Sequence, residues 1–78
     1  MVDSIKCLEC INDVREDVQG HDPRTWMKAC AIDTILKGGN SSDFKQCLEK
    51  KIRKEVKDIT DPKAYVDSLY NKVKGKCS

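Results

Sequence analysis

The chain has 78 residues, of which 36% are charged and 38% hydrophobic, and its formal net charge is +2 at pH 7. A chain of this length forms one domain, and its core is small unless disulfides, a metal or a partner chain add stability. No apolar run approaches the roughly 18 residues that a membrane-spanning helix needs. The first residues lack the basic and apolar segments of a signal peptide, so we expect a mature form.

The first predicted helix extends from Asp3 to Gln19, with Asp3 or Ser4 as its cap and Gly20 as the residue that ends it. Three- and four-residue spacing predicts one apolar face. That face contains Cys7, Ile11, Val14 and Val18.

The second helix is predicted to begin at Asp22-Pro23, an N-cap followed by a proline at the first helical position, and to end at Gly38-Gly39. It has the most apolar residues, so we expect it to be the most buried helix. Its apolar residues are Trp26, Met27, Ala29, Cys30, Ala31, Ile32, Ile35 and Leu36.

The third helix is predicted to start near Ser42-Asp43, where either side chain can cap it, and the fourth starts at Asp61-Pro62. Both carry an apolar stripe at helical spacing. In the third the stripe is Phe44, Cys47, Leu48, Ile52, Val56 and Ile59, and in the fourth it is Tyr65, Val66, Leu69 and Val73. The sequence therefore predicts a small all-α, disulfide-stapled bundle of four helices in one domain.

The five cysteines are the strongest compositional signal, because this density in a short chain is typical of a secreted, extracellular disulfide framework. The second and third helices are joined by a short loop and should be antiparallel, which predicts a Cys30–Cys47 bond. Cys77 should bond to Cys7 or Cys10, which lie one helical turn apart. The remaining thiol of that pair would be free, or would link two chains into a disulfide-bonded homodimer.

Three other interpretations of the cysteines stay open at this point. A reduced cytosolic protein can bury thiols as small apolar groups. Cys7-Leu8-Glu9-Cys10 fits a redox motif at a helix start, although no strand precedes it. Cys7 and Cys10 can also join two of Cys30, Cys47 and His21 around zinc, although a second close cysteine pair is missing. We expect no metal and no cofactor.

The Cys7-Leu8-Glu9-Cys10-Ile11 opening, Cys47 and Asp61-Pro62-Lys63 resemble the saposin-like family of small helical bundles. That family has six cysteines, and Asn71 stands near the position of its penultimate one. The resemblance implies a bundle whose last cysteine is tied back to the first helix, and a lipid-binding or membrane-active role. The ending from Tyr65 to Cys77, with Cys47, also resembles secretoglobins, which implies a disulfide-linked dimer that holds an apolar ligand.

Charge is distributed unevenly along the chain. Residues 1–43 hold five Lys/Arg and eight Asp/Glu, whereas residues 44–78 hold ten Lys/Arg and five Asp/Glu. A basic surface on the third helix is predicted to contact an anionic surface such as lipid or an acidic protein. It consists of Lys50, Lys51, Arg53, Lys54 and Lys57. Nucleic acid is disfavoured as a partner because no aromatic residues interleave with these cations.

The remaining chemistry-bearing residues favour binding over catalysis. His21, the single histidine, is expected in a solvated turn, Trp26 in the core and Tyr70 on the surface. No nucleophile, metal-protease or phosphate-loop motif is present, so we expect no enzymatic activity. The leading hypothesis is a small secreted protein that acts on a protein target, as a toxin, effector, pheromone or host-interaction factor. The alternatives are lipid binding through the basic amphipathic third helix and a secretoglobin-like dimer.

Overall fold

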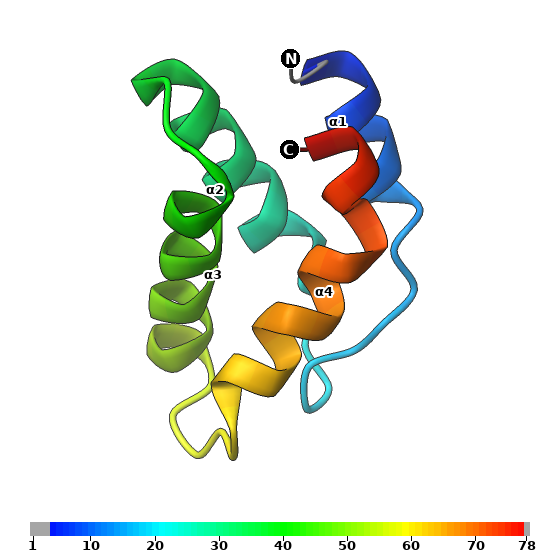
Figure 1. The fold of residues 1–78 in the computed structure, drawn as a ribbon. Helices are drawn as coiled ribbons and strands as arrows, with labels where there is room; N and C mark the ends of the chain where they lie inside the picture. Colours follow the sequence, from blue (N-terminus) through cyan, green and yellow to red (C-terminus); the bar gives the residue numbers. More distant parts are fainter. Residues whose placement is uncertain (1–3, 78) are drawn as a thin grey trace.

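The structure is a computed structural model that describes residues 4–77. Its helices are α1 (Ser4–Asn12), α2 (Arg24–Lys37), α3 (Ser41–Glu55) and α4 (Pro62–Cys77). Helix α1 packs against α2 and α4, and α3 packs against the same two helices. In Figure 1, α2 and α3 form one antiparallel pair and α1 and α4 form another, and both chain ends lie at the same end of the molecule. The predicted all-α bundle of four helices with disulfides is confirmed.

The core is formed by the apolar faces of all four helices, and the described residues include no buried polar or charged side chain. Helix α3 buries Phe44, Leu48 and Ile52, as its predicted stripe requires. Because these residues recur every four positions, they form one narrow face, and the lysines and glutamates occupy the others. The apolar face of α3 is therefore used inside the bundle.

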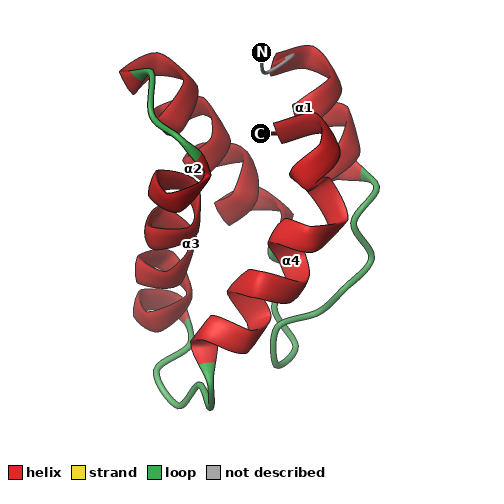
Figure 2. Cartoon of the chain, in the orientation of Figure 1, coloured by secondary structure: helices red, strands yellow, loops and turns green. Residues whose placement is uncertain are grey.

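The first helix is shorter than predicted, because α1 ends at Asn12 and an irregular segment follows it (Figure 2). The backbone N–H groups of Asp13 and Val14 donate to carbonyls three residues earlier, at 3.1 Å each, which tightens and closes the last turn. Val14 and Val18 are still buried. A spacing of four residues places two side chains on one face of a helix, and it also places them on one face of an extended chain, where alternate residues point the same way. Periodicity alone therefore predicted a helix where the chain is irregular.

Gly20 does not end a helix, as the sequence predicted, but completes a tight turn between Val18 and His21. These two residues exchange both backbone hydrogen bonds, at 2.9 and 3.0 Å. Between them Gln19 and Gly20 both have positive φ, 49° and 87°. That pair of angles is the one that a two-residue hairpin turn demands, and glycine adopts it without steric cost. His21 is exposed there, as expected.

The ends of α2 follow the predicted chemistry with a shift of one residue. The helix begins at Arg24 with Pro23 as its cap residue, and the Asp22 carboxylate accepts the Arg24 backbone N–H at 3.0 Å. At the other end Gly38 adopts a left-handed conformation, with φ of 66°. The predicted stop at Gly38 is confirmed.

The expectation that α2 is the most buried helix is wrong. Its fully buried residues are Met27, Cys30 and Ala31, whereas Ile32, Ile35 and Leu36 are exposed. In Figure 1 the C-terminal end of α2 lies away from α1 and α4, so those two helices do not cover its last turns. Apolar content predicts burial only where another element covers the side chain.

The start of α3 was placed two residues late. Asn40 is the N-cap, and its side chain accepts the Asp43 backbone N–H at 3.2 Å. The Asp43 carboxylate in turn accepts the Asn40 backbone N–H at 2.9 Å, which completes a capping box. Asp43 therefore stabilises the first turn from its third position, and Asn40 has the role that was predicted for Ser42 or Asp43.

The prediction that Tyr70 is exposed is wrong, whereas Trp26 packs against the core as predicted but is not fully buried. Tyr70 is only 8% exposed, because its ring packs against Phe44 with centroids 6.0 Å apart. The Lys45 ammonium lies over the Tyr70 ring, 4.6 Å from its centroid. Trp26 is only partly buried, and its ring lies 6.0 Å from that of His21.

Candidate functional site

Two disulfides tie the helices together in the predicted pattern. Cys30 in α2 bonds to Cys47 in α3, with Cα atoms 5.7 Å apart. Cys77 at the end of α4 bonds to Cys7 in α1, with Cα atoms 4.8 Å apart. The alternative that sequence reasoning left open, between Cys7 and Cys10, is thus decided in favour of Cys7.

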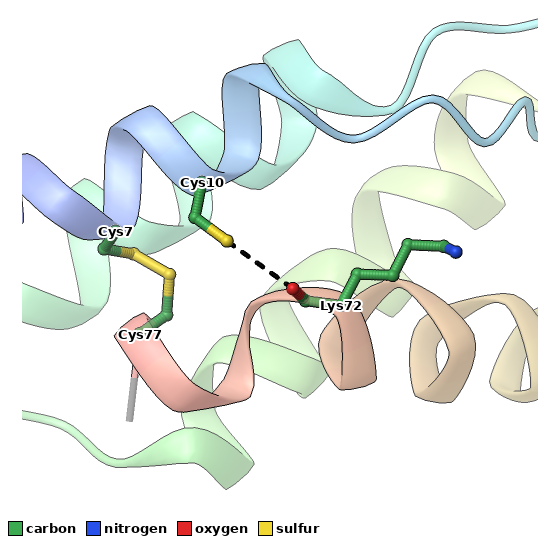
Figure 3. Close-up of a disulfide and its surroundings, with 4 residues drawn as sticks. All are labelled: Cys7, Cys10, Lys72 and Cys77. Atoms are coloured by element: carbon green, nitrogen blue, oxygen red, sulfur yellow. Dashed lines mark hydrogen bonds between the residues drawn. A yellow bond between two sulfur atoms is a disulfide. The ribbon is translucent and has the colours of Figure 1, made fainter.

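Cys10 is the one cysteine without a disulfide, and the sequence predicted that either Cys7 or Cys10 would have no partner within the chain. It is partly buried, and its thiol donates to the Lys72 backbone carbonyl across the α1–α4 contact at 3.5 Å (Figure 3). A homodimer linked by a disulfide would have to form through Cys10, because Cys7 is already bonded.

The disulfides also change the metal and redox interpretations. Cys7, Cys30 and Cys47 are oxidised, so they are not available as thiolate ligands for zinc. Within residues 4–77, no three His, Cys, Asp or Glu side chains are grouped so that they could hold a metal ion. Cys7 and Cys10 do not bond to each other, as a redox Cys-x-x-Cys pair would in its oxidised form.

A groove of about 430 Å³ lies beside the Cys7–Cys77 disulfide, which joins α1 to the end of α4. We call it the apolar groove. Its floor and walls come from α2, α3 and the Cys7–Cys77 disulfide, and most of its exposed surface is apolar. Its lining residues are Cys7, Ala31, Thr34, Ile35, Gly38, Gly39, Asn40, Ser41, Phe44 and Cys77.

Exposed apolar side chains gather at one end of the bundle. Ile5 in the first turn of α1 is 69% exposed, and Leu36 in the last turn of α2 is 81% exposed. In Figure 1 the start of α1 and the C-terminal end of α2 lie at the same end of the bundle. Ile32 and Ile35 on α2 are also exposed. A groove of the size typical of ligand sites, bordered by exposed isoleucine and leucine, is the common form of a recognition surface.

The apolar groove also carries hydrogen-bonding groups. Thr34 and Ser41 line it, and their hydroxyls make no side-chain hydrogen bond to any other residue that the structure describes. Asn40 uses its side-chain oxygen to cap α3. The groove therefore combines an apolar floor with polar groups at its edge, as specific binding pockets do.

The predicted basic surface is divided by the fold. Lys50, Lys51 and Lys54 line a second groove together with Lys37 of α2. Arg53 instead pairs with Glu49 one turn earlier, at 3.3 Å. Lys57 lies beyond the end of α3, in an exposed turn. Three of the five predicted cations are thus brought together, and Lys37 joins them although the sequence did not single it out.

Sequence reasoning missed the apolar groove altogether. The sequence of α2 contained a signal for this groove. The helix has eight apolar residues, which is more than one buried face can hold, so some of them had to be exposed. Met27, Cys30 and Ala31 fill that face, and the surplus includes Ile35 in the groove. Asn40-Ser41-Ser42 has the pattern of an N-glycosylation sequence, and Asn40 and Ser41 also line the groove.

Comparisons with protein-family models, with curated proteins and with solved structures found no match. Within the part of the chain that the structure describes, no helix has the length and apolar character needed to cross a membrane.

Proposed function

We propose that this chain is a secreted, non-enzymatic binding protein that recognises another protein through the apolar groove. The observation that carries this proposal is the coincidence of the groove with the exposed side chains of Ile5, Ile35 and Leu36 at one end of the bundle. The two disulfides support a role in an oxidising compartment, since they stabilise a small domain whose core is limited.

The groove suits an apolar side chain presented by a partner. Protein interfaces gain most of their affinity from a few large side chains that enter desolvated pockets. The Cys7–Cys77 disulfide and Phe44 form stiff walls, so little conformational entropy is lost when such a side chain enters. Leu36 and Ile5 would then be covered by the partner surface around that anchor.

A protein partner fits the edge of the groove better than a hydrocarbon chain does. Thr34 and Ser41 line the groove, and burying their hydroxyls under hydrocarbon without a hydrogen bond would cost free energy. A polypeptide supplies the missing donors and acceptors. The alternative of membrane binding by α3 as an amphipathic helix would need its apolar face, which is buried in the bundle core.

The saposin-like and secretoglobin-like resemblances stay predictions. The saposin-like one would favour a lipid in the apolar groove, and the secretoglobin-like one would favour an apolar ligand enclosed between two chains. We expect the protein partner to present a large apolar side chain to the apolar groove.

The test is a selection from a displayed library of random peptides against the disulfide-bonded protein, followed by titration of the selected peptides. We expect the selected peptides to share one large apolar residue, and to cause amide chemical-shift changes at Thr34, Ile35 and Ser41. The variant Ile35→Glu should weaken their binding by about tenfold or more.

The matched control is Ile32→Glu, which changes a second exposed isoleucine of α2 that does not line the groove. It should leave the affinity for the peptides within about twofold, since surface substitutions outside an interface have small effects. Equal losses in both variants, or binding that occurs only with lipid vesicles and not with any peptide, would refute the proposal.

A further inference from the structure

A second groove runs along the contact between α2 and α3 and has a volume of about 410 Å³. We call it the lysine groove. It shares only Thr34 with the apolar groove, so it is a separate site. It is lined by Asp33, Thr34, Lys37, Asp43, Gln46, Cys47, Lys50, Lys51 and Lys54.

Three of its cations have no counter-charge. Lys50, Lys51 and Lys54 make no ion pair within residues 4–77. Both acidic residues of the groove are already engaged. Asp33 pairs with Lys37 at 3.1 Å, and the Asp43 carboxylate caps the α3 N-terminus. The groove therefore presents a surplus of positive charge that solvent alone compensates.

The lysines are held on a rigid frame. The Cys30–Cys47 disulfide joins α2 to α3, and Cys47 itself lines the lysine groove. The separation between Lys37 on α2 and the lysines of α3 is thereby restricted. A ligand that contacts both helices does not have to bring them together, which lowers the entropic cost of binding.

The groove is long and follows the axis of α3. Its lining extends from Asp43 to Lys54, which corresponds to about 16 Å at the usual helical rise. Lys50 and Lys54 lie one turn apart on the same side of the helix. Lysine ammonium groups act as compact point charges, so they favour a ligand with anionic groups repeated along its length.

The lining excludes two other kinds of polyanion. No aromatic side chain is among the residues that line the groove, so nucleic-acid bases would have no stacking platform. No large apolar side chain lines it either, so a membrane surface would gain no apolar insertion there. Gln46, which does not line the apolar groove, supplies a neutral amide of the kind that binds sugar hydroxyls.

We propose that the lysine groove binds an extended sulfated polysaccharide, with Lys50, Lys51 and Lys54 on its sulfate groups and Lys37 at one end. This site acts independently of the apolar groove. A protein retained on such a polymer keeps its other binding surface free for its protein partner.

The test uses heparin as the probe and compares two triple variants of equal charge. Lys50→Gln, Lys51→Gln and Lys54→Gln remove the groove cations, and Lys63→Gln, Lys72→Gln and Lys76→Gln remove three exposed cations of α4. At about 0.15 M salt we expect the groove variant to bind heparin about tenfold more weakly or worse, and the α4 variant to stay within about threefold.

Salt titration gives a second readout. The slope of log Kd against log salt should fall by about two to three in the groove variant, because about three counterions are no longer released. Thermal unfolding of both variants controls for folding. Ile35→Ser removes the apolar side chain without changing the charge, so it should weaken peptide binding and leave heparin binding unchanged. Failure of this proposal is thereby distinguishable from failure of the proposed function.

Three results would overturn the proposal. Equal loss of affinity in the two triple variants would show that net charge alone attracts heparin. Tighter binding to single-stranded DNA than to heparin would assign the groove to nucleic acid. Binding to vesicles of anionic phospholipid that is stronger than binding to heparin, and is lost in the groove variant, would assign it to a membrane surface.

Discussion

At the scale of single residues, Asp22 and Arg24 join the end of α1 to the start of α2. The Arg24 guanidinium donates to both oxygens of the Asp22 carboxylate, at 2.7 to 3.0 Å, and also to the Asn12 carbonyl at 3.1 Å. The side-chain hydrogen bonds from Arg24, and then its backbone N–H, lower the pKa of Asp22 from 3.8 to about 2. Asn12 is the last residue of α1, so this arginine also satisfies a helix-terminal carbonyl.

The lowered pKa of Asp22 predicts a stability change in acid. A carboxylate whose pKa is lower in the folded than in the unfolded state stabilises the fold above the unfolded pKa. That stabilisation should be complete above about pH 4 and should be lost as the pH falls through about 2. NMR titration of the Asp22 carboxyl carbon should give a midpoint near 2.

Arg24→Gln is the control for this titration, since it removes the guanidinium and keeps the side-chain length similar. The Asp22 midpoint should then move up towards its ordinary value of 3.8. A midpoint that is ordinary in the unchanged protein would contradict the hydrogen-bonded geometry of this pair.

Cys10 provides the second prediction at this scale. Intact mass under non-reducing conditions should show two disulfides, and one thiol should react with an alkylating reagent after denaturation. In the folded protein that thiol should react more slowly, because it is partly buried and donates to the Lys72 carbonyl. Any covalent dimer should disappear in Cys10→Ser. Five free thiols would refute the framework.

At the scale of helices, two glycines in similar open surroundings should respond oppositely to alanine. Gly38 ends α2 with φ of 66°, whereas Gly75 lies inside α4, and an added Cβ would contact nothing within 4 Å at either position. Gly38→Ala should lower the free energy of unfolding by about 1 kcal/mol, because alanine is strained in the left-handed region.

Gly75→Ala should raise the free energy of unfolding by about 0.5–1 kcal/mol, because alanine restricts the unfolded chain and favours the helix. Denaturant titration of both variants measures the two values. If both substitutions shift the midpoint in the same direction, backbone conformation does not explain the role of Gly38.

At the scale of the whole molecule, the two disulfides close loops of very different length. The Cys7–Cys77 bond spans 70 residues and joins α1 to α4, whereas Cys30–Cys47 spans 17 and joins α2 to α3. Removing the first by Cys7→Ser and Cys77→Ser should cost about 4 kcal/mol of stability. Removing the Cys30–Cys47 bond by Cys30→Ser and Cys47→Ser should cost about 3 kcal/mol of stability.

Hydrogen exchange should locate the effect of the first bond. Helix α1 has only nine residues and depends on its neighbours for stability, so its amides should lose protection when the bond to Cys77 is removed. The amides of α3 should change less. A greater loss of stability from removal of the Cys30–Cys47 bond would contradict the loop-length argument.

The sequence was sufficient for the fold and for most of the covalent framework. Its proline, glycine and cap residues are local signals that act within a few positions, and three of the four helices begin or end close to where these signals stand. The Cys30–Cys47 bond followed from two helices and a short loop. The choice of Cys7 over Cys10 did not follow, because both lie on one helix face and only packing against α4 separates them.

Both candidate sites were decided by the tertiary structure. The exposure of Ile35 and the burial of Tyr70 depend on whether another helix covers each side chain, which no local pattern reports. The sequence determined that Lys50, Lys51 and Lys54 share a basic helix. Lys37 lines the same groove as these lysines because α2 packs on α3. Arg53 does not line that groove, and its side chain pairs with Glu49. Interactions between residues close in sequence determine where the helices of this protein form. Contacts between residues distant in sequence determine which side chains remain exposed and which grooves they line.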